Sequence, residues 1–398
     1  MNILQICNKS PYPPKEGGPI AMYNLAEGLI DAGHKVIVLA ISTPKYFVDI
    51  NGLPEEYRNR TSFSAVYIDT SLKFLGAFIN LFSSGSYHVE RFDSQAMHKR
   101  ISEILQEKKF DIIQLETVYI GPYLETIRKY SNARIVLRAH NIEHLIWQRI
   151  ARTTKNPLKR MYLSYLAGKL RKYETGLFSR VDGIACISEI DAQFIKGGEI
   201  SIPVETIPFG MKVPEKMSAQ EYLGDLTFFH IGSMDWMPNQ EGIRWFLDSC
   251  MPLLAKEFPD NKILLAGRNM PAWVYDYSYS NLEIVGEVDD ALGFINKQHI
   301  MFVPLFSGSG VRIKIIEGMA MGKVIISTAI GAEGIEYKDG ENILIANSPE
   351  QFVEKFRFCV SNPDQCKRLG TNASKLIHVR HNIVKTSQLL TDFYDTLA

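Results

Sequence analysis

Short, almost uninterrupted hydrophobic runs alternate with longer amphipathic segments along the whole chain. In the first half the runs are NILQIC, KVIVLA, FDIIQLE, ARIVLRA and DGIACIS, and in the second half LTFFHIG, KILLAG, LEIVGE, IMFVPL and KVIIST. Amphipathic stretches such as 20–32 and 239–258 lie between them. Continuous hydrophobic strands separated by helices are typical of parallel sheets that helices cover on both faces. The pattern therefore predicts an α/β protein with two doubly wound parallel sheets.

The segment TIPFGMKVPEKM at residues 206–217 marks the break between the two sheets. Proline, glycine and a loss of periodicity occur together there. Ligands of doubly wound sheets bind outside the carboxyl ends of the strands. We therefore expect a first domain at residues 1–210, a second beginning at residue 211, and a ligand shared in a cleft between them.

Composition narrows the class of protein. The 398 residues carry 44 Lys+Arg and 44 Asp+Glu, so the formal net charge of zero argues against a nucleic-acid-binding protein. The five cysteines are scattered without a CxxC pair, which predicts reduced thiols and no zinc site. No hydrophobic run approaches the roughly 20 residues of a membrane-spanning helix, and the first residues do not resemble a signal peptide. We expect a cytoplasmic protein, at most attached to the inner face of a membrane.

A glycine-rich turn joins a predicted strand to a predicted helix in the second domain. The strand HIMFVPL leads into FSGSG at residues 306–310 and then into a helix from Val311. This arrangement aims free backbone N–H groups at a phosphate. Arg312 and Lys314 follow in the first helical turn, where cations oppose the helix macrodipole. We expect them to be counter-charges of a bound diphosphate; a solvated basic face beside an ordinary turn is the alternative.

Two more glycine-bearing turns follow predicted strands, AIGAEG at residues 329–334 and PPKEGGP at residues 13–19. Neither these turns nor FSGSG matches GxGxxG or GxxxxGK[ST]. A dinucleotide enzyme and a P-loop NTPase are therefore disfavoured.

Together these segments resemble a known enzyme family. YPPKEGGPIAMYNLAEGLIDAGHKVIVL, RAHNIEHLIW, ACISEID, TIPFGM, HIGSMDWMPNQEGIRWF and GSGVRIKIIEGMAMGKVIISTAIGAEGI are similar to motifs of the family-4 retaining glycosyltransferases (glycosyl transferases group 1), in family order. The resemblance implies the GT-B fold, with two Rossmann-like domains. It places the acceptor on residues 1–210 and the nucleotide-sugar mainly on residues 211–375. In a last segment at 376–398, the helical pattern at Ile383–Leu397 is expected to cross back to the first domain.

The resemblance also implies roles for single residues. Glu317 takes the position of the acid that binds the nucleotide ribose, and His140 approaches the donor sugar. Arg312 and Lys314 complete the predicted catalytic set. The predicted donor-binding residues are Gly17, Gly18, Gly232, Ser307, Gly308, Ser309, Gly310, Val311, Val288 and Glu317.

Two positions depart from the family pattern. Ser309 stands where many members have a glutamate that contacts the donor sugar, eight residues before Glu317. Ser233 and Asn239 stand where many members have an arginine and a lysine that bind the diphosphate. We infer that Arg312 and Lys314 have taken over that cationic role. The family is typically metal-independent, so we expect neither a metal nor another cofactor.

The segment between Glu143 and Glu174 contains no acidic residue. It carries eight basic ones: Arg149, Arg152, Lys155, Lys159, Arg160, Lys169, Arg171 and Lys172. A basic amphipathic segment fits an anionic membrane surface or a phosphorylated acceptor. An ordinary solvated helix face is the alternative.

The leading hypothesis is a metal-independent, retaining glycosyltransferase. It would move a sugar from a UDP- or GDP-sugar to a saccharide or lipid-linked acceptor, in polysaccharide or glycoconjugate biosynthesis. A GT-B sugar-nucleotide epimerase and a non-catalytic carbohydrate-binding protein of the same fold are the alternatives.

Overall fold

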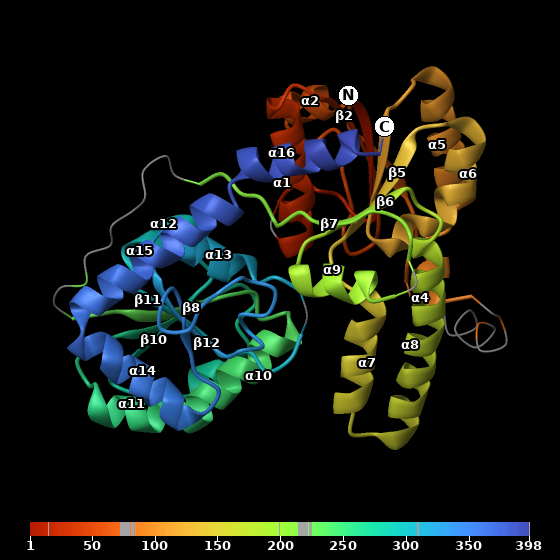
Figure 1. Cartoon of the computed structure of the whole chain (residues 1–398). Coiled ribbons are helices and arrows are strands. Elements are labelled where there is room, and N and C mark those ends of the chain that lie inside the picture. The colour runs from red at the N-terminus through yellow and green to blue at the C-terminus, as the bar shows by residue number, and fades with distance from the viewer. Residues whose placement is uncertain are drawn as a thin grey trace. The chain divides into compact units, whose positions relative to one another are not determined.

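The chain forms two compact units in the computed structural model (Figure 1). The structure describes residues 1–14, 16–71, 80, 83, 85–198, 200–213, 222, 225–308 and 310–397. The first unit consists of Met1–Met211 and Ile383–Ala398, and the second of Lys212–Asn382. The last segment was expected to separate from the second domain at residue 376, with its returning helix at Ile383–Leu397. Helix α15 (Pro363–Arg380) instead runs through that position inside the second unit, and the separate helix α16 (Ile383–Asp395) follows it.

The first unit contains a seven-stranded parallel sheet in the order β3-β2-β1-β4-β5-β6-β7. Its strands are β1 (Asn2–Cys7), β2 (Lys35–Ser42), β3 (Ser64–Tyr67), β4 (Ile112–Glu116), β5 (Arg134–Ala139), β6 (Gly183–Cys186) and β7 (Val204–Thr206). Its helices are α1 (Gly17–Asp31), α2 (Glu55–Thr61), α4 (Tyr87–Glu90), α5 (Gln95–Glu107), the 3₁₀-helix η1 (Val118–Tyr123), α6 (Leu124–Tyr130), α7 (Glu143–Thr153), α8 (Pro157–Phe178), α9 (Glu189–Lys196) and α16.

Alternate residues of each strand face opposite layers of helices, as the two-residue period of a strand requires. Leu4 and Ile6 of β1 pack in a core cluster with α5, α6 and α9, whereas Ile3 and Cys7 pack in a second cluster with α1, α2 and α16. The last helix of the chain therefore completes one face of the first sheet (Figure 1).

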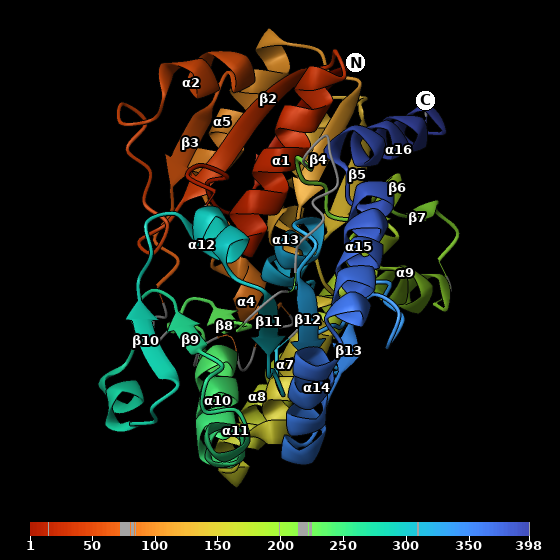
Figure 2. The same cartoon turned by 90° about the vertical axis from the view of Figure 1, so that its left-hand side faces the viewer.

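The second unit repeats this plan with six parallel strands in the order β10-β9-β8-β11-β12-β13 (Figure 2). They are β8 (Phe228–Ile231), β9 (Ile263–Ala266), β10 (Leu282–Gly286), β11 (Ile300–Val303), β12 (Val324–Ser327) and β13 (Leu344–Ile345). Its remaining elements are α10 (Met237–Trp245), a π-helical turn η2 (Phe246–Cys250), α11 (Met251–Glu257), the 3₁₀-helix η3 (Ala272–Asp276), α12 (Ala291–Lys297), α13 (Ile313–Ala320), α14 (Pro349–Ser361) and α15. Helices α10, α11 and α14 cover one face of the sheet, and α12 and α13 lie on the other (Figure 1). Helix α15 begins in the core cluster beside α14 and runs on to the end of α13.

The amphipathic stretch 239–258 was expected to be one helix, and the structure divides it. Helix α10 passes through η2 into α11. Pro252 lies at the start of α11, where it lacks an N–H and its ring would collide with the carbonyl group four residues earlier in a regular helix. That residue, Asp248, lies within the wider π-helical turn, which accommodates the proline without ending the helix.

The close contact between Gly242 and the backbone of Pro304 predicts that two glycine substitutions will have opposite effects on stability. A Cβ at Gly242 of α10 would overlap the backbone carbonyl of Pro304, whereas a Cβ at Gly176 of α8 would have nothing within 4 Å. We expect Gly242→Ala to lower the free energy of unfolding of the second unit by about 3 kcal/mol. Gly176→Ala should raise that of the first unit by up to about 1 kcal/mol through helix propensity. Denaturant unfolding measures both; equal effects would contradict the contact with Pro304.

Candidate functional site

Each sheet has a point where the order of its strands reverses, between β1 and β4 and between β8 and β11. Ligands of doubly wound sheets bind outside the carboxyl ends of the strands at such points. In the second unit, β8 ends before Gly232 and β11 leads to the loop 304–312. Gly232 and the loop 304–312 therefore both lie where a ligand binds in sheets of this topology.

The glycines of the 304–312 loop have backbone conformations that other residues rarely adopt. Gly308 has φ of 99° and Gly310 has φ of 82°. A Cβ at Gly308 would lie 2.8 Å from the ring of Trp236, so the loop also packs too closely for a side chain. Ser309, the position where a glutamate was expected, lies outside the described residues. Gly308 thus brings the backbone on one side of that position close to the Trp236 ring.

Helix α13 begins two residues later than expected, at Ile313. Arg312 is its N-cap residue, with extended backbone, and Val311 precedes the helix. The side chain of Arg312 is buried, donates a hydrogen bond to the carbonyl oxygen of Gly310, and places its guanidinium carbon 5.2 Å from the centre of the Trp236 ring. Arg312 therefore holds the glycine loop against the segment that follows β8.

Lys314 connects the start of α13 with the end of β8 and the segment that follows it. Its Nζ donates to Oδ1 of Asn239 at 3.0 Å and lies 3.4 Å from Nε2 of His230. Nδ2 of Asn239 donates in turn to the carbonyl oxygen of Ser233 at 2.7 Å, which orients the amide. A Cβ at Gly232 would lie only 2.8 Å from the Lys314 ammonium. The two positions that depart from the family pattern, Ser233 and Asn239, thus hold Lys314 at the end of β8.

The surroundings of Lys314 disfavour its charge. Burial first, and then the charge of Arg312, lower the pKa of Lys314 to about 7. Burial and the neighbouring ammonium keep the pKa of His230 well below its ordinary value, while Nδ1 of His230 lies 3.0 Å from the carbonyl oxygen of Phe302. A negatively charged ligand would restore the charge of Lys314.

Glu317 lies one turn further along α13. Burial raises the pKa of its carboxyl group to about 7, and within the described part of the chain no side chain or backbone donor bonds to it. A half-buried carboxyl group without a partner fits a ligand that supplies hydroxyl donors. Ser307, in contrast, donates to Glu241 at 2.7 Å. Val288 follows β10, which β9 separates from β8, so the structure does not group it with Lys314.

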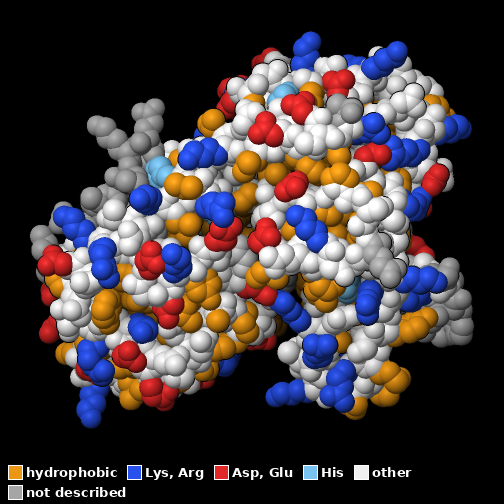
Figure 3. All heavy atoms as spheres, in the orientation of Figure 1, with side chains coloured by type: hydrophobic (Ala, Val, Ile, Leu, Met, Phe, Trp, Pro, Cys, Tyr) orange, Lys and Arg blue, Asp and Glu red, His pale blue; other side chains and the backbone are white. Residues whose placement is uncertain are grey.

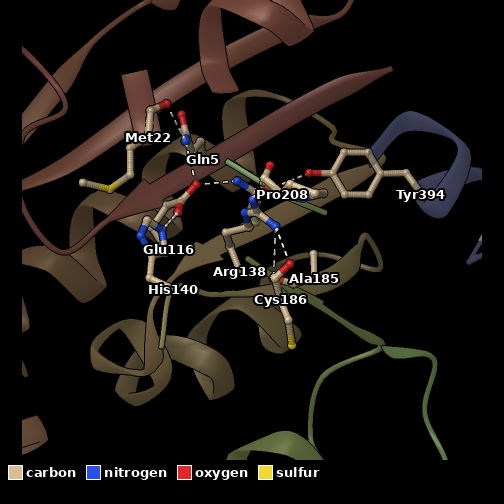
Figure 4. Close-up of polar contacts among 10 residues, drawn as sticks. Gln5, Met22, Glu116, Arg138, His140, Ala185, Cys186, Pro208 and Tyr394 are labelled. Atoms are coloured by element: carbon tan, nitrogen blue, oxygen red, sulfur yellow. Dashed lines mark hydrogen bonds and ion pairs between the residues drawn. The ribbon is translucent and has the colours of Figure 1, made fainter. Parts of the chain in front are cut away.

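In the first unit, His140 follows β5 and belongs to a buried polar network (Figure 4). Its Nε2 lies 2.6 Å from Oε2 of Glu116, the last residue of β4. Gln5 donates to the other oxygen of Glu116 at 2.7 Å, and Gln114 donates to the same oxygen. Burial alone would raise the pKa of Glu116, but the hydrogen bonds and charges of His140, Gln5 and Arg138 outweigh it and lower the pKa. Glu116 is thus an ionised carboxylate that fixes the His140 ring.

The network extends to the last helix of the chain. The Tyr394 hydroxyl of α16 donates to Gln114, and the buried Arg138 guanidinium donates to the backbone carbonyl groups of Ala185, Cys186 and Pro208 (Figure 4). Sequence reasoning missed Glu116. The signal was a lone glutamate ending the hydrophobic run FDIIQLE, on the strand beside β1.

Gly17 and Gly18 form the first turn of α1, which begins three residues earlier than the expected helix. The first turn of α1 contains no acidic residue. A Cβ at Gly18 would lie 2.9 Å from Cε of Lys9, so this glycine permits the lysine to lie against the start of the helix. A cation again lies at a helix N-terminus, as in the second unit.

Three comparisons connect this geometry to known proteins. Residues 225–362 match the family model of the glycosyl transferases group 1. A protein of the cps region of Klebsiella pneumoniae, described as an uncharacterized 44.6 kDa protein, is 24% identical over 96% of this chain and 97% of its own length. A phosphatidyl-myo-inositol mannosyltransferase of Mycolicibacterium smegmatis is 24% identical over 86% of this chain and 79% of that protein.

Solved structures show the same fold. HepE of Anabaena in complex with UDP superimposes with a TM-score of 0.67 at 12% identity, over the full length of both chains. Sucrose-phosphate synthase of Thermosynechococcus elongatus gives a TM-score of 0.69 at 15% identity, over 100% of this chain and 99% of that one. These likenesses and the two parallel sheets confirm the predicted GT-B fold.

The described residues contain no group of three or more His, Cys, Asp and Glu side chains arranged to hold a metal ion. Among the same residues, no helix combines the length and hydrophobicity needed to cross a membrane.

The pKa of Lys314 predicts how the affinity for a nucleotide-sugar depends on pH. A bound diphosphate raises the pKa of Lys314 above its free value of about 7, so binding takes up a proton. The association constant should then fall as pH rises above 7, by up to about tenfold per pH unit. A nucleotide-sugar is the suitable ligand, because its diphosphate has no group that titrates in this range.

The test uses the Glu317→Gln protein as background, because the carboxyl group of Glu317 also titrates near pH 7. Calorimetry in two buffers of different ionisation enthalpy measures the proton uptake. Lys314→Arg in this background should abolish the pH dependence, since a guanidinium stays charged. An unchanged slope in Lys314→Arg would show that another group titrates.

Proposed function

Because this chain is a glycosyltransferase of the GT-B fold with a group 1 domain, we propose that it moves a sugar from a UDP- or GDP-sugar to a saccharide or lipid-linked acceptor. We propose further that transfer retains the anomeric configuration, requires no metal and serves the synthesis of a polysaccharide or glycoconjugate. The observation that carries the proposal is the position of Lys314, which Asn239 and Ser233 orient at the end of β8.

The diphosphate of the donor would lie at the start of α13. Backbone N–H groups at a helix N-terminus bind phosphate, and the glycine loop allows the phosphate to approach them closely. Lys314 and Arg312 would neutralise its charge. Negative charge grows on the diphosphate as the sugar leaves, so fixed cations and oriented N–H groups stabilise the transition state more than the bound donor. These protein cations would supply the charge that a metal supplies in other transferases.

Glu317 would bind the ribose of the donor. Its half-buried carboxyl group has no donor among the described residues, and ribose hydroxyl groups would provide two. Hydrogen bonds from these hydroxyl groups favour the ionised carboxylate, so the pKa of Glu317 should fall when the nucleotide binds. The donor-binding set proposed here also includes Gly17, Gly18 and Val288, on the family resemblance alone.

His140 would act on the donor sugar from the first unit. Its Nε2 is engaged by Glu116, which leaves Nδ1 for a hydroxyl group of the sugar. A carboxylate behind a histidine fixes the orientation of the ring. Glu116 is therefore a positioning residue in this proposal.

Relatives support a uridine donor and a glycan acceptor. The structures of Anabaena HepE contain UDP, UDP with glucose, and UDP-glucose. Another structure of the same fold, that of TarM, contains UDP and a glycosylated glycerol. These ligands belong to the relatives and guide the choice of donors for this chain.

A donor screen tests the function. The protein is mixed with UDP- and GDP-sugars and a glycan or glycolipid extract, and release of free UDP or GDP is measured with and without EDTA. We expect one donor to release its nucleotide in both conditions, and NMR of the product to show the anomeric configuration of the donor. Conversion of a donor without an acceptor would identify an epimerase. Donor binding without turnover would identify a carbohydrate-binding protein and overturn the proposal.

Two substitutions should separate the diphosphate from the nucleoside. Arg312→Ala should weaken the binding of the active nucleotide-sugar about tenfold or more and the binding of its nucleoside little. Glu317→Gln should weaken both, because the ribose is common to them. Arg357→Ala is the matched control in the second unit, since its ion pair with Glu257 is largely exposed and worth little. Equal losses for both ligands in Arg312→Ala would show that Arg312 does not act on the diphosphate.

We also propose that the first unit lies on an anionic membrane surface, on the inner face of the membrane. Helices α7 and α8 form a hairpin that protrudes from the unit (Figure 1). Leu158 is 73% exposed, Met161 is 68% exposed, and Tyr165 is 44% exposed. Basic and hydrophobic side chains gather at the end of this hairpin (Figure 3). An exposed hydrophobic tip between cations matches an anionic lipid surface in charge and polarity.

Vesicle binding tests this surface. The protein should co-sediment with vesicles that contain phosphatidylglycerol and remain free with phosphatidylcholine vesicles alone. Leu158→Ser with Met161→Ser, and separately Lys159→Glu with Arg160→Glu, should each reduce binding about tenfold or more. Lys108→Glu with Lys109→Glu, which changes exposed lysines elsewhere in the unit, is the control. Equal binding by the hairpin variants and the control would overturn the membrane proposal.

A further inference from the structure

A pocket of about 360 Å³ lies in the first unit where β1 and β2 end. Its walls come from the segments that follow β1, β2 and β3 and from the residues after α4. This volume is within the range of pockets that hold small ligands. The position is also the carboxyl edge of the sheet, where this topology binds ligands.

Three cations from separate segments line the pocket. Lys9 follows β1, Lys45 follows β2, and Arg91 follows α4. The Nζ atoms of Lys9 and Lys45 lie 4.8 Å and 5.0 Å from the centre of the Tyr46 ring. The described residues that line the pocket include no aspartate or glutamate. Three positive charges around one cavity indicate a ligand with negative charge.

Two buried polar atoms in the same walls lack a partner among the described residues, Oδ1 of Asn8 and Nε of Arg91. The Arg91 guanidinium is held in place, because it donates to the carbonyl oxygen of Thr70 at 2.9 Å and packs over the Tyr87 ring at 5.7 Å. Buried polar atoms in proteins are almost always paired. A ligand that both accepts and donates hydrogen bonds would satisfy both atoms.

Acidic groups near the pocket compensate its charge only in part. Glu16 accepts a hydrogen bond from the Tyr46 hydroxyl at 2.8 Å. Burial lowers the pKa of Lys9, and the charge of Lys45 lowers it further, while Glu16 and Glu143 act in the opposite direction without cancelling the shift. The pKa of Glu143 is itself raised to about 7 by burial, so this carboxyl group is only partly ionised at neutral pH. The N-terminus of α1 beside Lys9 adds further positive potential.

We propose that this pocket binds an anionic group of the acceptor, a carboxylate or a phosphate attached beside a sugar ring. Lys9, Lys45 and Arg91 bind the anionic group, and Tyr46 and Phe92 offer aromatic surface to the ring. The pocket depends on the proposed function only for the statement that its ligand is the acceptor. The acceptor is then an acidic or phosphorylated saccharide and not a neutral one.

Direct binding to the whole chain tests the proposal with three defined sugars. Methyl glucuronide carries a carboxylate, glucose 1-phosphate carries a phosphate, and methyl glucoside carries neither. We expect at least one of the two anionic sugars to bind about tenfold or more tightly than methyl glucoside, with an affinity that falls as salt rises. The anionic sugar that binds more tightly shows whether the pocket prefers a carboxylate or a phosphate.

Lys45→Met should reduce the affinity for the anionic sugar severalfold, because Lys9 and Arg91 remain, and leave the affinity for methyl glucoside unchanged. Lys45 is exposed, so the substitution should not disturb folding, which a melting curve checks. Lys108→Met is the control, since Lys108 precedes β4 and lies at the opposite edge of the sheet. Equal binding of the three sugars, or an unchanged anionic preference in Lys45→Met, would overturn the proposal.

The same samples are tested for stabilisation by nucleotide-sugars, which act on the second unit. Donor binding and turnover without any anionic preference would overturn the pocket and leave the proposed function standing. A Lys45-dependent anionic preference without donor binding would overturn the proposed function and leave an acid-binding site.

Discussion

A positive charge beside a helix N-terminus is unfavourable unless an anion lies between them. This constraint applies to Lys314 at the start of α13 in the second unit. Lys314 occupies the first turn of α13, and no ion pair of Lys314 occurs within the described part of the chain. Asn239, His230 and Gly232 surround its ammonium, and burial lowers its pKa to about 7. Without a ligand, the buried ammonium at the helix N-terminus destabilises the second unit. A bound diphosphate would remove this destabilisation. The glycine loop and the helix start provide the N–H groups that would hold the other side of the same anion.

The first unit shows the same constraint in a different form. Lys9 lies against the start of α1, and Glu116 is buried at the end of β4. Glu116 remains ionised because His140, Gln5 and Gln114 bond to it and Arg138 lies nearby. Buried charges that are fully hydrogen-bonded hold their neighbours in one geometry. Because Tyr394 of α16 bonds to Gln114, the last helix also contributes to the orientation of His140.

The sequence pattern was sufficient for the architecture. The ten hydrophobic runs correspond to strands β1, β2, β4, β5, β6, β8, β9, β10, β11 and β12. The pattern missed β3, β7 and β13, which are edge strands of four, three and two residues with few buried side chains. Such strands form because a neighbouring strand offers hydrogen bonds. They contain too few hydrophobic residues for the sequence pattern to indicate a strand. The π-helical turn at Pro252 depends on packing of the whole helix and was not predicted.

Single residues of the candidate site could be predicted from the sequence, but the contacts between them could not. Glycines before a helix and two cations indicated an anion site, and the family resemblance supplied roles for Glu317 and His140. The sequence could not show that Asn239 orients Lys314, because 75 residues separate them. It also could not show the convergence of Lys9, Lys45 and Arg91, which depends on the order of strands in the sheet.

A structure of the chain with a bound nucleotide-sugar would show whether the start of α13 holds the donor diphosphate. We expect diphosphate oxygens to lie within hydrogen-bond distance of Nζ of Lys314 and of backbone N–H groups at the start of α13, with the ribose hydroxyl groups on Glu317. A diphosphate bound away from Lys314, or held by a metal ion without contact to α13, would contradict it.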